Sequence, residues 1–152
     1  ARDLGTSLCR SVRYRYYCFR PFCLETMMGY RSDVKYILLF KTAEGALKAK
    51  AMAELEFSEV DDGHEILTNM ENHVVPEAEF PYRIQVHYED VKWYESIPWV
   101  RAQENFIKQF NSSEEQHVFV RVGEDYSDYE TFESNDVYVS DYIEYFRITE
   151  FV

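Results

Sequence analysis

The sequence is poor in the residues from which several common catalytic and nucleotide-binding sites are built. It has only five glycines in 152 residues, none of them clustered, and it contains neither G-x-x-x-x-G-K-[ST] nor G-x-S-x-G. The first motif cradles phosphates in P-loop proteins, and the second carries the nucleophile of α/β-hydrolases. Both classes are therefore disfavoured.

Cysteine is also scarce, and its placement argues against a stapled or metal-bound fold. The three cysteines are odd in number and lie close to the amino end, at Cys9, Cys18 and Cys23. A disulfide framework would need pairs spread over the domain. Structural zinc needs four ligands in short paired spacings, and the closest pair here is C-x4-C without a histidine in the same segment. We expect reduced thiols and no zinc.

Long apolar runs are also missing, and basic side chains are few relative to acidic ones. No run approaches the roughly 20 residues that span a bilayer, and no leader pattern is visible. Lys and Arg number 16 against 28 Asp and Glu, which gives a net charge of −12. The electrostatic field of a protein with this net charge repels nucleic acid and anionic lipid and attracts cations. We expect a soluble cytoplasmic protein that binds neither nucleic acid nor membrane directly and whose partners are basic.

The four histidines show no metal-binding or phosphoesterase spacing. His87-Tyr-Glu89 has half of a zinc deaminase signature, but no P-C-x-x-C follows it. His87 and His117 fall on the polar faces of predicted strands, so we expect exposed imidazoles there. We predict no catalytic residue, cofactor or metal, although a carboxylate pair assembled from distant residues, as in a small metal-dependent hydrolase, stays an open alternative.

Charge divides the chain into two parts. Residues 1–26 carry five arginines and a net charge of +3, whereas residues 27–152 carry a net charge of −15. Within the first part, Val12 to Cys18 alternates apolar and basic residues with the period of a half-buried strand. We predict a basic amino-terminal arm over 1–26 and an acidic domain over 27–152. The arm either contacts the acidic body of the same or a neighbouring subunit, as in a homo-oligomer, or is an edge strand with solvated arginines.

The first half of the acidic domain has readable elements. Val34–Phe40 is a nearly continuous apolar run, which predicts a central strand covered on both faces. Thr42 is placed to cap a helix from Ala43 to about Phe57. Asp61-Asp62-Gly63 predicts a turn. The apolar stripe of the helix recurs at four-residue spacing, at Leu47, Ala51 and Leu55.

The second half predicts further strands and one more helix. Tyr82–Glu89 alternates strictly, so its even-numbered residues should face the core. Pro98 stands in the first turn of a helix that ends near Asn111. His117–Val122 and part of residues 135–151 predict strands, and residues 64–80 a short strand or irregular connection. The order favours a single α+β domain, an antiparallel or mixed sheet with two helices on one face, with a ferredoxin-like arrangement as the leading topology.

The segment GEDYSDYETFESND, Gly123 to Asp136, has six carboxylates and no basic side chain. It lacks the alternating ligands and sixth-position glycine of an EF-hand loop. Clustered charge of one sign with interleaved tyrosines suits a basic protein surface, whereas charge runs are also commonly only solvated. The predicted partner-binding residues are Glu124, Asp125, Tyr126, Asp128, Tyr129, Glu130, Glu133, Asp136, Asp141 and Glu144.

Three segments, GYRSDVKY (Gly29 to Tyr36), EDVKWY (Glu89 to Tyr94) and FVRVGEDYSD (Phe119 to Asp128), resemble small acidic uncharacterised proteins of tailed bacteriophages. The resemblance covers Met28 to the carboxyl end and assigns no functional residue. It implies the cytoplasm of an infected bacterium, where such proteins often inhibit host enzymes. We therefore predict a non-enzymatic inhibitor that mimics nucleic acid and occupies a basic site on a nucleic-acid-handling or host-defence protein. The alternative is a structural or assembly component that uses the basic arm for subunit contacts.

Overall fold

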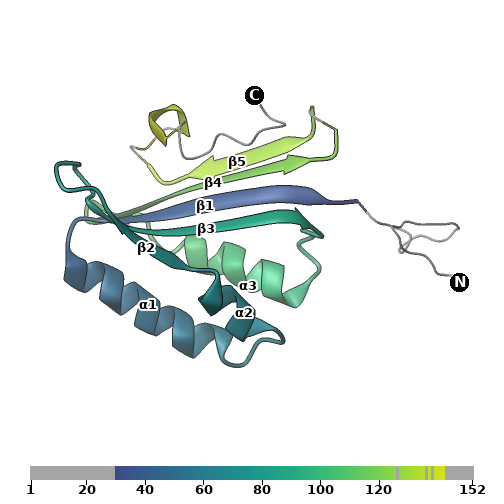
Figure 1. Ribbon diagram of the computed structural model, residues 1–152, viewed down its shortest axis with the longest axis horizontal. Coiled ribbons are helices and arrows are strands. Elements are labelled where there is room, and N and C mark those ends of the chain that lie inside the picture. Colours follow the sequence, from purple (N-terminus) through teal and green to yellow (C-terminus); the bar gives the residue numbers. More distant parts are fainter. Residues whose placement is uncertain (1–29, 126, 136, 138, 143–152) are drawn as a thin grey trace, which may run out of the picture. The chain divides into compact units, whose positions relative to one another are not determined.

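The chain folds around a five-stranded antiparallel sheet with the strand order β2-β3-β1-β4-β5 (Figure 1). The computed structural model describes residues 30–125, 127–135, 137 and 139–142. The elements in chain order are β1 (Ser32–Phe40), α1 (Ala43–Phe57), α2 (Gly63–Thr68), β2 (Glu71–Val74), β3 (Tyr82–Val91), α3 (Pro98–Ile107), β4 (Glu115–Gly123), β5 (Tyr129–Glu133) and the 3-10 helix η1 (Val139–Tyr142).

The topology confirms the predicted α+β domain. Helices α1, α2 and α3 all lie on one face of the sheet (Figure 1). The core order β4-β1-β3-β2, with α1 between β1 and β2 and α3 between β3 and β4, is the ferredoxin-like arrangement. Strand β5 extends it beyond β4. Helix α2 was not predicted, because Gly63–Thr68 form a helix at the start of the segment where a short strand or irregular connection was expected. The short strand is confirmed further along that segment, where Glu71–Val74 form β2.

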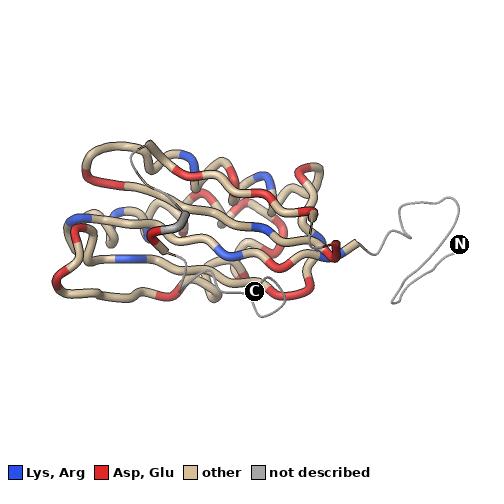
Figure 2. Tube along the Cα trace, turned by 90° about the horizontal axis from the view of Figure 1, so that it is seen from above, with Lys and Arg blue, Asp and Glu red and all other residues tan. Residues whose placement is uncertain are grey.

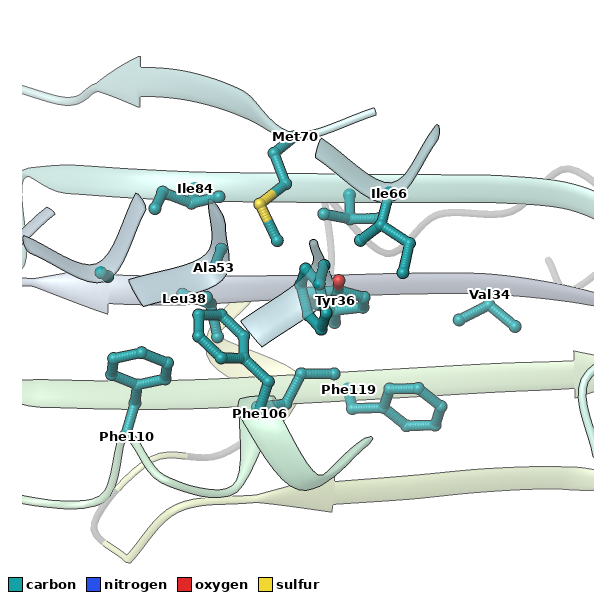
Figure 3. Packing of buried hydrophobic residues seen from close by; sticks show 14 of the residues in the cluster. Val34, Tyr36, Leu38, Ala53, Ile66, Met70, Ile84, Phe106, Phe110 and Phe119 are labelled. Atoms are coloured by element: carbon teal, nitrogen blue, oxygen red, sulfur yellow. The ribbon is translucent and has the colours of Figure 1, made fainter. Parts of the chain in front are cut away.

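Strand β1 lies in the middle of the sheet and is buried on both faces, as its apolar run predicts. Val34, Tyr36 and Leu38 point toward the helices, where they pack with Phe106 and other residues (Figure 3). Phe40 belongs to the same cluster. Ile37 and Leu39 face the other way and belong to a second cluster, whose other members are Phe80, Val118, Val120, Val122 and Val137.

Helix α1 begins where predicted, but its buried stripe is a different one. The Thr42 hydroxyl oxygen accepts a hydrogen bond from the Gly45 amide at 3.0 Å, which caps the helix. The buried residues are Ala49, Ala53 and Phe57, whereas Leu47 is 68% and Leu55 76% exposed. The apolar stripe at Leu47, Ala51 and Leu55 therefore does not face the core. Small alanines let the helix approach the sheet closely, and Phe57 fills the remaining space with an edge-to-face contact on Phe106 at 5.2 Å between ring centroids.

The predicted turn at Asp61-Asp62-Gly63 is confirmed and brings α2 back against the end of α1. Asp62 has a left-handed backbone with φ of 64°, which aspartate tolerates better than most residues. A Cβ added at Gly63 would lie 1.9 Å from the Phe57 carbonyl oxygen, so only glycine fits this approach. At the other end of α2, the Asn69 side-chain amide donates to the His87 carbonyl oxygen on β3 at 2.9 Å. The corner between α1 and α2 is thus fixed at both sides.

The remaining element predictions have mixed outcomes. Strand β3 buries Ile84 and Val86 as its alternation predicts, and α3 starts at Pro98 as expected. The carboxyl-terminal prediction of a strand is not confirmed over Val139–Tyr142, which form η1, and residues 143–152 lie outside the described residues. So does the predicted arm over 1–26. No helix within the described residues is both long enough and apolar enough to cross a membrane.

Candidate interaction surface

The predicted partner-binding stretch forms the turn between β4 and β5 together with β5 itself. The Gly123 amide donates to the Asp128 carbonyl oxygen at 2.8 Å, and the Asp128 amide donates to the Asp125 carbonyl oxygen at 2.7 Å, which closes the turn. Strand β5 then pairs with β4 from Val122 opposite Tyr129 to Val118 opposite Glu133. We name the described carboxylates of this stretch the hairpin acids: Glu124, Asp125, Asp128, Glu130 and Glu133.

Arg121 on β4 compensates two of the hairpin acids. Its guanidinium lies 3.0 Å from Asp128 and 3.3 Å from Glu130, and it also donates to the Ser32 hydroxyl at 3.0 Å. The Arg121 side chain is only 15% exposed. Burial lowers the pKa of Arg121, but the hydrogen bonds and charges of Asp128 and Glu130 outweigh it and raise the pKa overall. Asp128 and Glu130 are therefore committed to an internal cation.

Asp125 is exposed but is held locally by the turn. Its carboxylate accepts hydrogen bonds from the Ser127 amide at 3.0 Å and from the Ser127 hydroxyl at 2.9 Å. These two bonds lower the pKa of Asp125. The carboxylate keeps its charge and remains open to solvent, so it can still face a partner.

The other predicted residues do not gather at one place. Side chains alternate between the two faces along β5. Glu130 and Phe132 therefore project to one face of the sheet, and Tyr129 and Glu133 to the other. Tyr129 is 56% exposed, and Asp141 is exposed in η1. The structure thus brings Asp128 and Glu130 together and separates Glu133 from them. Tyr126, Asp136 and Glu144 lie outside the described residues.

A second acidic run, which the sequence analysis did not select, lies where α1 ends and α2 begins. Its twelve residues, 54–65, contain six carboxylates and no lysine or arginine. All six are exposed, and none of them forms an ion pair with a lysine or arginine among the described residues. Figure 2 shows how acidic positions outnumber basic ones along the described trace. We name this group the acidic corner: Glu54, Glu56, Glu59, Asp61, Asp62 and Glu65.

Apolar surface adjoins the acidic corner. Leu47 and Leu55 are the exposed leucines of α1, and the exposed Ala51 lies between them at helical spacing. Leu55 stands within the acidic corner itself, between Glu54 and Glu56. An exposed apolar stripe with a charged border has the composition of a protein–protein contact, an apolar centre with a polar rim.

A small pocket lies beside the acidic corner, two of whose carboxylates contribute to its lining. Its volume is about 240 Å³, and its lining comes from α2 and the residue before it, from β3 and from α3. The lining residues are Asp62, Glu65, Ile66, Tyr88, Val91 and Trp99.

The wall of this pocket belongs to a cluster of three aromatic rings. The centroid of the Trp99 ring lies 5.7 Å from that of Tyr88 and 5.5 Å from that of Trp93. Trp93 is buried and donates from Nε1 to the Glu104 carboxylate at 2.7 Å, while the Tyr88 hydroxyl donates to the side-chain oxygen Oε1 of Gln103 at 3.3 Å. Burial is the main cause that raises the pKa of Tyr88. These contacts fix the ring positions.

His117 and Gln103 are buried polar groups with structural partners. The prediction of an exposed imidazole at His117 was wrong, because β4 is covered on both faces and His117 is only 4% exposed. Its Nδ1 lies 2.8 Å from the Phe110 carbonyl oxygen, and burial lowers the pKa of His117. Gln103 is fully buried and accepts a hydrogen bond from the Tyr36 hydroxyl at 2.6 Å. Both bonds tie α3 and the loop after it to the sheet.

His87 is exposed on β3, as predicted. Burial of part of the ring, followed by the charge of Lys35 on the neighbouring strand, lowers the pKa of His87. Glu89 lies 3.7 Å from its Nε2. Over the described part of the chain, no three His, Cys, Asp or Glu side chains are grouped closely enough to hold a metal ion.

Compared with protein-family models, with curated proteins and with solved structures, the chain matches none of them. The resemblance to acidic bacteriophage proteins therefore stays a prediction.

Proposed function

We propose that this chain is a non-enzymatic binding protein that occupies a basic site on another protein, of the nucleic-acid-handling or host-defence kind that the resemblance suggests. The observation that carries the proposal is the acidic corner: six exposed carboxylates without a compensating lysine or arginine in twelve residues, next to exposed leucines. Carboxylates grouped in this way attract a cationic surface and orient it before contact.

The acidic corner supports this function better than the hairpin acids do. Asp128 and Glu130 already share Arg121, so a partner's cation would have to compete with an internal one. The acidic corner has no such competitor within the described residues, and its backbone is fixed by Gly63 and by the anchor of Asn69 on β3. A fixed surface loses less conformational entropy when it binds.

The leucine stripe adds what charge alone does not supply. Exposed charge pairs stabilise a complex by little and are screened by salt. Burial of Leu47 and Leu55 against a partner would contribute salt-independent affinity. We therefore propose a contact with both parts, a leucine centre on α1 and an acidic border.

The test is an affinity capture from bacterial lysate at two salt concentrations with three baits. The first is the wild-type protein and the second carries Glu54→Gln, Glu59→Gln, Asp61→Asn and Glu65→Gln. The third is a matched control with Glu124→Gln, Asp125→Asn, Glu133→Gln and Asp141→Asn, which removes the same charge elsewhere.

We expect the wild type and the control to capture the same basic proteins at low salt. The second bait should not capture them. Equal capture by all three baits, or capture that does not depend on salt, would contradict the proposal. The assembly alternative depends on the arm over 1–26, which lies outside the described residues.

A further inference from the structure

The pocket beside the acidic corner combines two carboxylates with aromatic walls. Asp62 and Glu65 are exposed at its rim, Trp99 and Tyr88 are half-buried along its wall, and Ile66 is buried. These groups come from α2 with its preceding residue, from β3 and from α3. Charge and aromatic surface therefore meet at this place only because of the fold.

The size of the pocket limits its occupant. Sites for drug-sized ligands enclose about 300–1,000 Å³, whereas this pocket measures about 240 Å³. It suits the end of one long side chain better than a cofactor or a nucleotide. An anionic occupant is disfavoured as well, because it would approach Asp62 and Glu65.

Aromatic faces beside carboxylates favour a flat cation. Tryptophan is the ring that attracts cations most strongly through its face, and arginine does this more often than lysine. The guanidinium group is planar, holds its hydration shell less tightly than an ammonium group, and can stack on a ring while its N–H groups donate to carboxylates.

We infer that this pocket receives the guanidinium of an arginine presented by a protein partner. The inference rests on the proposed function and deepens it, because it selects an arginine-bearing surface among all basic ones. Trp99 and Tyr88 would contact the guanidinium face, and Asp62 and Glu65 would accept its hydrogen bonds. The remaining carboxylates of the acidic corner would contribute only longer-range attraction.

The indole N–H groups offer a direct readout, because the chain has two tryptophans, Trp93 and Trp99. Their two signals in a ¹H–¹⁵N spectrum are followed while acetyl-arginine-N-methylamide is added. Acetyl-citrulline-N-methylamide serves as the neutral probe of nearly the same shape, and acetyl-lysine-N-methylamide as the non-planar cation. We expect the Trp99 signal to shift in a saturable way as the arginine probe is added. The affinity for either of the other two probes should be at least about fivefold weaker.

Two double variants with equal loss of charge separate the pocket from the general field. Asp62→Asn with Glu65→Gln removes the rim carboxylates, and asparagine tolerates the left-handed backbone at position 62. Glu54→Gln with Glu59→Gln is the matched control within the acidic corner. We expect the first pair to weaken arginine binding about fivefold or more and the second to leave it within about twofold. Unchanged signals of buried Trp93 show that each variant is folded.

Equal binding of the arginine and citrulline probes, equal binding of lysine, or equal weakening by both double variants would each overturn the arginine pocket. These results leave the proposed function standing if salt-sensitive capture by the acidic corner is still observed. The converse result is also informative. If the pocket binds the arginine probe but the protein captures no basic protein from lysate, the arginine pocket is supported and the proposed function is contradicted.

Discussion

The hairpin acids and the acidic corner have the same residue types at a similar density, but the fold treats them differently. Strand β4 places Arg121 beside Asp128 and Glu130, so part of the charge is neutralised within the domain. At the acidic corner, the end of α1, the following turn and the start of α2 together expose six carboxylates. A run of like charge in a sequence is therefore not sufficient to identify a binding surface. What decides is whether a neighbouring element supplies a counter-charge.

The largest effect should follow from removing the internal cation. Arg121→Met would remove the cation that Asp128 and Glu130 share and would break three hydrogen bonds of a mostly buried side chain. We expect a loss of about 2 kcal/mol in the free energy of unfolding. Urea denaturation measures it. An unchanged midpoint would mean that Arg121 does not hold the hairpin acids together.

The next effect concerns binding rather than stability. Leu47→Gln with Leu55→Gln alters only exposed surface, so the free energy of unfolding should stay within about 0.5 kcal/mol of the wild type. Affinity for a captured partner should fall about tenfold, because the apolar contact is lost. Surface plasmon resonance with that partner measures it. If affinity is unchanged, the leucine stripe lies outside the contact.

Neutralising carboxylates should change the free energy of unfolding in opposite directions in the two regions. Asp128→Asn removes the shorter ion pair of Arg121 and should cost about 1 kcal/mol of stability. Glu59→Gln with Asp61→Asn relieves repulsion between like charges and should increase stability by about 0.3 kcal/mol. Paired urea titrations at low salt compare the two. The same sign in both regions would contradict the difference on which the proposed function rests.

A smaller effect concerns pH and the buried His117. Because burial lowers the pKa of His117 in the folded state, the unfolded chain takes up the proton first as the pH falls. Its contribution to stability is therefore complete above the ordinary histidine value of about 6.5 and is lost as the pH falls from there toward the lower folded-state value.

His117→Asn, which keeps an amide donor near the Phe110 carbonyl, should flatten the dependence of the urea midpoint on pH between about 7.5 and 5.5. Val118→Ala is the matched control, because it weakens the same strand without removing a titrating group. It should keep the wild-type slope. A wild-type slope in His117→Asn would show that another group titrates.

Much of the fold could be predicted because its elements have strong local patterns. The apolar run of β1, the alternation of β3 and the cap at Thr42 are all local, and each predicts its element correctly. The buried face of α1 could not be predicted in this way. Leucines at four-residue spacing indicate a stripe that faces the core, but the residues that pack against the sheet are those of the stripe around Ala53, which contains small side chains. That choice depends on the distance between helix and sheet.

The candidate site was less accessible from sequence. The density of carboxylates in residues 54–65 is a sequence signal that could have been selected alongside the stretch Gly123 to Asp136. The role of Arg121 could not have been, since it depends on strand register. The pocket depends on the meeting of Glu65, Tyr88 and Trp99 from three elements, which no spacing in the sequence reveals.

The most direct test of the acidic corner as a binding surface is to map where a basic probe contacts the protein. A nona-arginine peptide is titrated into the ¹⁵N-labelled chain at low salt and again at high salt, and backbone amide shifts are followed. We expect salt-sensitive shifts concentrated in residues 54–65 and on the exposed face of α1 around Leu47 and Leu55. Shifts concentrated in residues 124–133 instead, or spread evenly over the acidic domain, would contradict this expectation.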